Sequence, residues 1–295
     1  MQYRREHECY YLEKYTGTES TVIVPSHKEQ LKVTIIAPKA FLSCKSVSEI
    51  VLPETITQIG DWAFAHMKNL KKLTLPAKSI QFGKNVFLDC EQLTQIFPSP
   101  DYSDTVGISY FLASAVTLLN NISLCRPELA GSKTEYKRWL ADYDDVLLQF
   151  IDAPDENGFE PVFFGWFDVD DVDVQKQRFI IKRQREKTSL AFQRLLYPEA
   201  LNINTKNALC HYLTSHMPGG SLATEHTIPF TMVCEEYGND IRYIKLLADM
   251  KYITHETFPL LMEGLHDAGA EVMAFLLRYQ QTELSTSDFF AGLSL

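Results

Sequence analysis

Apolar and polar positions alternate with a period of two along short stretches of the first hundred residues, and these stretches recur every 23 residues. Alternation at period two is typical of a β-strand that buries one face. The pairs that recur at this spacing are Ala40-Phe41, Ala63-Phe64 and Val86-Phe87, together with Leu52-Pro53, Leu75-Pro76 and Phe97-Pro98. Several positions that repeat together at one fixed spacing predict a solenoid of stacked coils.

Each predicted coil consists of a strand, a turn, a second short apolar stretch and a buried aromatic residue. The strands Ile50-Val51-Leu52 and Leu73-Thr74-Leu75 end at prolines, because proline cannot donate a hydrogen bond to a continuing ladder. Gly60 and Gly83 are expected at a tight bend that needs relaxed backbone dihedrals. We expect the aromatic residues of successive coils to stack on one another, namely Phe41, Phe64 and Phe87.

The clearest copies of this unit are IVLPETITQIGDWAFAHMKNL at 50–70 and LTLPAKSIQFGKNVFLDCEQL at 73–93. They resemble the BspA-type leucine-rich repeat, a bacterial variant with about 23 residues per coil. The resemblance covers roughly residues 20–100. It implies a β-solenoid whose role is binding rather than chemistry, and many members of the family are displayed on bacterial surfaces.

The solenoid is expected to begin irregularly and to end at a proline-rich turn. The stretch Val22-Ile23-Val24-Pro25 reaches the next copy after 28 residues instead of 23, so it predicts an irregular first coil that acts as a cap. The segment 98–105 holds two prolines and polar turn residues, as an exit from the repeats would. We therefore expect an α+β protein, with a short leucine-rich-repeat solenoid at 1–100 and an all-α domain at 101–295.

Beyond this boundary the apolar period changes to about 3.6, which is typical of amphipathic helices. Helices are expected at about 106–121, 132–150, 174–197, 204–216, 227–236, 239–250, 255–267 and 269–280. The last of these alternate with short turns, in the manner of ankyrin-like helical hairpins. The resemblance is weak because the Thr-Pro-Leu-His signature is absent, and a generic helical bundle is the alternative.

Composition narrows the classes of partner and the compartment. The formal net charge of −10 over 295 residues disfavours nucleic acid, whose phosphates need clustered Lys and Arg. The longest apolar stretch, roughly 106–119, is too short to cross a bilayer, so no membrane insertion is expected. The N-terminal residues lack the apolar core of a secretory signal, which favours the cytoplasm over the cell surface or secretion. Six widely spaced cysteines without a CxxC pair predict free thiols.

Three groups of residues are candidates for metal sites, and none is predicted to bind a metal. The acidic run Asp168-Val-Asp170-Asp171-Val-Asp173 lacks the Gly and Glu of an EF-hand loop, so we expect a solvated loop that caps the third helix. The stretch 155–158 does not match an EF-hand loop either, because Ala153 occupies the first ligand position. The third group lacks the paired short spacings that zinc prefers; it consists of Cys210, His211, His216, His226 and Cys234.

Two further clusters are candidates for binding surfaces. The aromatic string Phe163-Phe164-Gly165-Trp166-Phe167 is either core or an exposed interaction patch, and core is favoured. A basic cluster could contact an acidic partner, although a solvated helix face is favoured; its members are Lys176, Arg178, Lys182, Arg183, Arg185 and Lys187.

The sequence favours a non-catalytic protein that binds other proteins through its repeat surface. It contains no Gly-x-Ser-x-Gly, no phosphate-binding glycine loop and no His-Glu-x-x-His, so no catalytic, metal or cofactor residue is assigned. The alternatives are an adhesin-like binder at the cell surface and an unrecognised enzyme in the helical domain. The enzyme hypothesis predicts a deep pocket lined by His, Asp or Glu with shifted pKa values. The partner, the binding face and the oligomeric state are not predicted.

Overall fold

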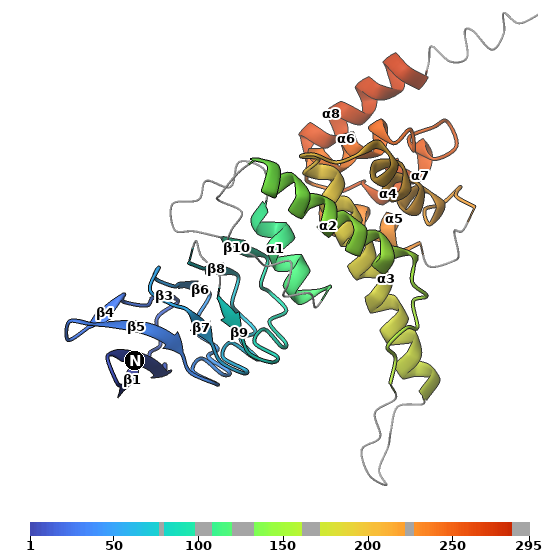
Figure 1. Ribbon diagram of the computed structural model, residues 1–295. Coiled ribbons are helices and arrows are strands. Elements are labelled where there is room, and N and C mark those ends of the chain that lie inside the picture. Colours follow the sequence, from blue (N-terminus) through green and yellow to red (C-terminus); the bar gives the residue numbers. More distant parts are fainter. Residues whose placement is uncertain (77–79, 98–107, 120–132, 161–171, 222–226, 285–295) are drawn as a thin grey trace, which may run out of the picture. The chain divides into compact units, whose positions relative to one another are not determined.

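The computed structural model describes residues 1–76, 80–97, 108–119, 133–160, 172–221 and 227–284 (Figure 1). By compactness the chain divides into two units. The first is Met1–Leu147 with Glu199–Leu201, and the second is Leu148–Pro198 with Asn202–Leu295. The predicted boundary between residues 100 and 101 lies outside the described residues, so the domain limits stay a prediction.

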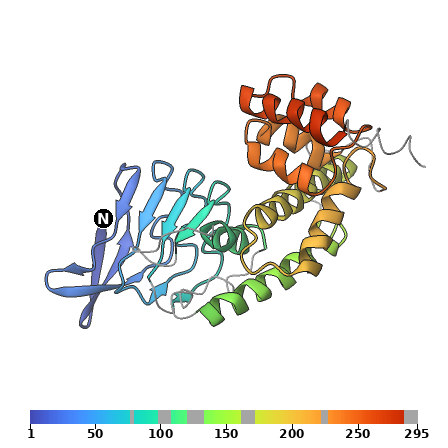
Figure 2. The ribbon, with the colours of Figure 1, turned by 90° about the horizontal axis from the view of Figure 1, so that it is seen from above.

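The first unit begins with a β-solenoid, which confirms the predicted α+β class. Its strands are β1 (Gln2–Glu6), β2 (Cys9–Lys14), β3 (Thr21–Ile23), β4 (His27–Lys28), β5 (Leu31–Ile36), β6 (Glu49–Val51), β7 (Gln58–Ile59), β8 (Lys72–Thr74), β9 (Gln81–Phe82) and β10 (Gln95–Phe97). One sheet has the order β1-β2-β5-β7-β9, with β4 paired to β5, and the other has the order β10-β8-β6-β3. The coils lie side by side in Figure 2.

The predicted aromatic stack is confirmed. The ring centroids of Phe41 and Phe64 are 5.3 Å apart, and those of Phe64 and Phe87 are 5.7 Å apart. Tyr15 extends the stack by one ring, at 5.2 Å from Phe41. All four rings are buried, so each coil completes the apolar interior of its neighbour, as in other repeat proteins.

The glycines of the repeat serve a different purpose from the one predicted. In the described residues, only Gly158 and Gly219 among glycines have positive φ, so Gly60 and Gly83 need no unusual dihedrals. A Cβ on Gly60 would lie 2.6 Å from the backbone nitrogen of Pro38. The equivalent atom on Gly83 would lie 2.5 Å from that of Asp61. Glycine is therefore required because neighbouring coils approach closely at this position.

Different elements lie at the two ends of the solenoid. The first coil predicted at Val22 is present, because β3 pairs in parallel with β6, but β3 is the edge strand of its sheet, and its role as a cap stays a prediction. The preceding antiparallel hairpin β1–β2 was not predicted, and β2 pairs in parallel with β5. At the other end, helix α1 (Ile108–Thr117) packs against β10. Its Phe111 ring lies 5.3 Å from Tyr143, whose hydroxyl is 2.9 Å from Ser114 Oγ.

The remaining described chain is helical, as predicted. Its elements are α2 (Lys133–Asp152), α3 (Val172–Leu196), α4 (Ile203–Ser215), α5 (Ile228–Met232), the π-helix η3 (Val233–Tyr237), α6 (Ile241–Asp249), α7 (Phe258–Gly264), α8 (Ala270–Tyr279) and the π-helix η4 (Gln280–Leu284). No described helix combines the length and the apolarity that a membrane span needs.

Two successive helical hairpins in the second unit repeat a local signal 30 residues apart. Helices α5 and α7 each begin after a threonine, Thr227 or Thr257, with a proline in the first turn. Proline suits that position because the first-turn N–H groups have no intrahelical acceptor. The two hairpins are joined where the Gly269 N–H donates to Asn239 Oδ1 at 2.8 Å. Stacked hairpins are present, and the ankyrin-like resemblance stays a prediction.

Candidate functional site

The outward face of the sheet β10-β8-β6-β3 carries two rows of aligned side chains. Alternation along each strand points Val22, Ile50, Leu73 and Ile96 into the core, where they are buried. The strand register aligns the outward residues into a polar row, Thr21, Glu49, Lys72 and Gln95. It aligns the second row as Ile23, Val51, Thr74 and Phe97.

The second row places apolar side chains on the solvent side of the sheet. Ile23 is 69% exposed, Val51 and Phe97 are partly exposed, and Thr74 is 8% exposed. The corresponding outward positions on β7 and β9 of the other sheet are Gln58 and Gln81, which pair in register. In the same row of the other sheet, Ile35 on β5 pairs with Gln58 and is partly exposed, as Val51 is. The two faces therefore differ mainly at Ile23, which is the aliphatic residue of these rows that is mostly exposed.

The turns between strands hold left-handed residues at the repeat spacing. Lys39, Trp62 and Asn85 have φ of 61°, 59° and 52°. Ser43, His66 and Asp89 form a second set, with φ of 59°, 57° and 53°. Within it, His66 Nδ1 lies 2.8 Å from Asp89 Oδ2 of the next coil. Non-glycine residues in this conformation are strained, and backbone hydrogen bonds between coils hold them there, for example from Trp62 N to Lys84 O at 2.9 Å.

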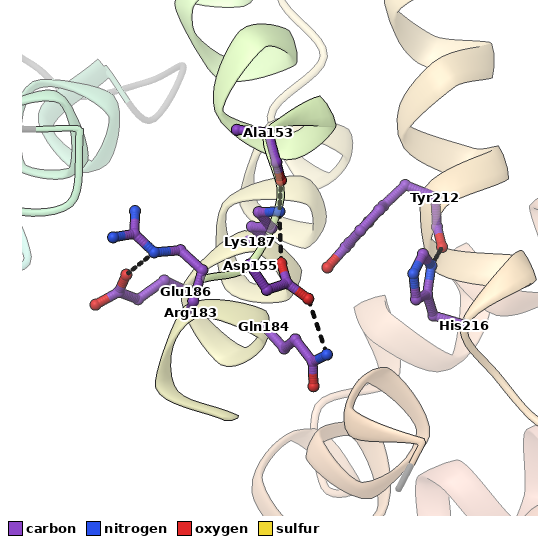
Figure 3. Close-up of polar contacts among 8 residues, drawn as sticks. All are labelled: Ala153, Asp155, Arg183, Gln184, Glu186, Lys187, Tyr212 and His216. Atoms are coloured by element: carbon purple, nitrogen blue, oxygen red, sulfur yellow. Dashed lines mark hydrogen bonds and ion pairs between the residues drawn. The ribbon is translucent and has the colours of Figure 1, made fainter. Parts of the chain in front are cut away.

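The second unit contains a buried ion pair (Figure 3). Lys187 on α3 is 3% exposed, and its Nζ donates to Asp155 Oδ1 at 2.6 Å and to the carbonyl of Ala153 at 2.5 Å. Gln184 Nε2 donates to Asp155 Oδ2 at 2.9 Å. The predicted solvated basic face is therefore wrong at Lys187: α3 becomes buried at this turn, and the ammonium takes acceptors from the loop after α2.

A cavity of about 360 Å³ lies beside this pair. Tyr212 and His216 on α4 contribute to its wall, and their rings are 4.6 Å apart. Burial raises the pKa of the Tyr212 hydroxyl, so this group stays protonated at neutral pH. His216 Nδ1 lies 2.7 Å from the Tyr212 carbonyl oxygen.

The other predicted candidates are not brought together into a site. Residues 163–167 lie outside the described residues, as do Asp168, Asp170, Asp171 and His226. Asp173 occupies the first turn of α3. Burial raises the pKa of the Cys210 thiol and raises that of Cys234 to about 11. Within the part of the chain that is described, no three potential ligands are grouped.

The fold and the aligned faces define a parallel-stranded repeat solenoid. Residues 19–126 match the family model of the BspA type leucine rich repeat region in six copies. The segment is similar to BspA-type leucine-rich repeats, as the sequence resemblance indicated. A comparison with curated proteins found no significant match.

Three solved structures are similar to the repeat region. A leucine-rich repeat protein of T. pallidum is 29% identical, with 32% of this chain and 45% of that chain covered, at a TM-score of 0.32. A leucine rich cell surface protein of Faecalibacterium prausnitzii is 27% identical, with coverages of 31% and 27% and a TM-score of 0.29. A leucine-rich repeat protein of Bacteroides capillosus is 22% identical, with coverages of 32% and 91% and a TM-score of 0.26. The chain spans less than half the length of the first two.

Proposed function

We propose that this protein acts without catalysis, as a module that binds another protein through the outward face of the sheet β10-β8-β6-β3. The observation that carries the proposal is an aliphatic pair aligned on neighbouring strands, in which Ile23 is exposed and Val51 is partly exposed. Exposed aliphatic side chains on a rigid sheet offer contact area at little cost in conformational entropy. The partner that fits is a protein surface that places an apolar side chain against this pair.

The polar row beside the pair would fix the orientation of the partner. Glu49 and Lys72 lie directly opposite each other on β6 and β8, so the row presents both signs of charge. A partner with a matching pair of charges would be held in one register, since charge complementarity contributes mainly to specificity. Acidic and basic groups in alternation also disfavour a polyanion such as nucleic acid.

Non-catalytic character and the cytoplasmic location stay predictions. For the enzyme hypothesis, the cavity beside Lys187 is one relevant place, because it contains Asp155, His211 and His216. A second cavity, of about 380 Å³, is lined by His211 and Glu256. Tyr212 is the group in the cavity beside Lys187 with a resolved pKa shift, and the shift is upward. A tyrosine that holds its proton more tightly is a weaker general acid, and almost none of it is present at neutral pH as the tyrosinate that could act as a base. This supports a binding role over a catalytic one.

The proposal is tested with two variants of the full-length chain. Ile23→Asp places a charge in the apolar row, and Gln58→Asp places the same charge on the outward face of the other sheet. Both positions are exposed, so both variants are expected to fold. We expect wild type and Gln58→Asp to retain the same partner from the producing cell. Ile23→Asp should retain about tenfold less of that partner, or less still. Equal retention by all three proteins would exclude this face.

A further inference from the structure

The cavity beside the buried ion pair has an apolar floor and an aromatic wall. It is formed by the end of α2 with the following loop, by α3 and by α4, and its apolar lining comes from Leu148, Ile151, Ala153, Pro154 and Ala208. Tyr212 adds an aromatic ring (Figure 3). A volume of about 360 Å³ is at the lower end of the range for small-molecule sites. The cavity therefore suits a group about the size of one long side chain.

Lys187 does not make this cavity a site for anions. Its ammonium already has two close acceptors, Asp155 Oδ1 and the carbonyl of Ala153. With Asp152 also at the lining, the formal charges of Asp152, Asp155 and Lys187 sum to −1. An anion would be repelled by this net negative lining, because the Lys187 ammonium already has acceptors. A cation would be attracted.

The polar groups around the cavity favour a hydrogen-bond donor as ligand. His216 Nδ1 lies 2.7 Å from a carbonyl oxygen, which can only accept, so Nδ1 donates there and Nε2 is the ring nitrogen left for a ligand. Asp152 is exposed at the rim and adds a carboxylate. The Tyr212 ring offers a face on which a planar cation can stack. Acceptors, negative charge and an aromatic face together match a guanidinium better than an ammonium.

We propose that this cavity binds an alkylguanidinium group, with the aliphatic stem against the apolar floor and the planar cation against Tyr212 and the acceptors. The group could come from a free small molecule or from an arginine side chain of a partner protein. This site is separate from the exposed sheet face of the solenoid and does not depend on the function proposed for that face.

The direct test is calorimetric titration of the full-length protein with three probes. n-Butylguanidine represents the free monocation, N-acetyl-arginine methylamide represents the side chain within a polypeptide, and N-acetyl-citrulline methylamide is the uncharged analogue of nearly the same shape. We expect saturable binding of at least one cation, with a dissociation constant of about 0.1–1 mM. Citrulline should bind at least about tenfold more weakly, because it lacks the charged hydrogen bonds. Comparable binding of citrulline and arginine, or no saturation by either cation, would overturn the proposal.

The two cations distinguish the source of the ligand. Tighter binding of the capped arginine than of n-butylguanidine indicates that the site recognises an arginine within a polypeptide. The reverse order indicates a free small molecule. Either order supports the guanidinium site.

Two pairs of variants place the binding in this cavity. Ala208 lines the cavity and is exposed on α4, so Ala208→Phe should fill it and abolish binding; Asn207→Phe, at the neighbouring exposed position outside the lining, should leave binding unchanged. Asp152→Asn should weaken binding about three- to tenfold. Asp145→Asn removes the same charge from an exposed position of the same helix and should have no effect. Wild-type binding by Ala208→Phe would place the ligand elsewhere and overturn the proposal.

Discussion

The coils of the solenoid and the helices of the second unit bury different kinds of side chain. Within the described part of residues 1–97, the buried residues are apolar or aromatic, and Thr74 is the exception. The helices of the second unit bury Lys187, Thr188, Arg194, Thr205, Ser215 and Thr257. The packing of the solenoid is thus determined by one apolar unit that is used repeatedly. The packing of the helical unit also depends on particular polar contacts.

This difference explains where each region offers a function. A repeated apolar core leaves the outward positions free to vary, so the two sheet faces differ although the coils are alike. In the helical unit the polar groups are part of the packing, and the cavity borders a buried ion pair. The solenoid therefore offers a surface suited to another protein. The helical unit offers a cavity suited to one cationic group.

The largest expected effect is on the aromatic stack. Phe64 is fully buried between the rings of Phe41 and Phe87. Phe64→Ala should therefore lower the free energy of unfolding by about 3–5 kcal/mol, measured by denaturant unfolding. Leu88→Ala, at a partly exposed position on the neighbouring coil, should change it by less than about 0.5 kcal/mol. A loss below about 1 kcal/mol for Phe64→Ala would show that the stack does not hold the coils together.

A smaller, asymmetric effect is expected at the ion pair. Asp155→Asn leaves the buried Lys187 ammonium without its carboxylate, and should cost about 2–3 kcal/mol of unfolding free energy. Lys187→Met removes the buried charge and keeps the volume, so it should cost about 1 kcal/mol or less. Asp155 is partly exposed and retains Gln184 as a donor. Equal losses of unfolding free energy for the two variants would contradict the view that the buried Lys187 charge depends on its carboxylate partner.

The smallest expected effect is a gain in stability at the turns. Lys39 is exposed and has φ of 61°, so Lys39→Gly should relieve left-handed strain and stabilise the protein by about 0.5 kcal/mol after the loss of chain entropy. Lys45→Gly is the matched control, because Lys45 is exposed and does not have positive φ; it should be neutral or destabilising. Thermal melting curves should therefore shift upward for Lys39→Gly and should be unchanged or shift downward for Lys45→Gly.

The solenoid could be predicted because its information is repeated. Each recurring position samples the same environment three times, so Phe41, Phe64 and Phe87 identify the core without any knowledge of the fold. The hairpin β1–β2 was missed because it occurs once and has no copy for comparison. The role of Gly60 was misjudged because contact with Pro38 depends on how neighbouring coils stack, and local sequence does not encode that distance.

The candidate sites were less accessible from sequence. The apolar row on the outward face requires the strand register. The continuous apolar run Val22-Ile23-Val24 does not show by itself which face of the strand is exposed. The pair Lys187–Asp155 joins residues 32 positions apart, and in the sequence Lys187 looks like the last member of a solvated basic face. Nothing in the spacing of charges indicated that this one member is buried, because burial there is set by the packing of α3 against other helices.

The most direct test of the proposed function uses a photo-crosslinking amino acid placed at residue 23 or at residue 58 of the full-length chain in the producing cell. Both sites are exposed, and they lie on the outward faces of different sheets. We predict a discrete protein adduct from residue 23 and none from residue 58. Adducts of equal yield from both positions, or an adduct from residue 58 alone, would contradict recognition through the Ile23–Val51 face.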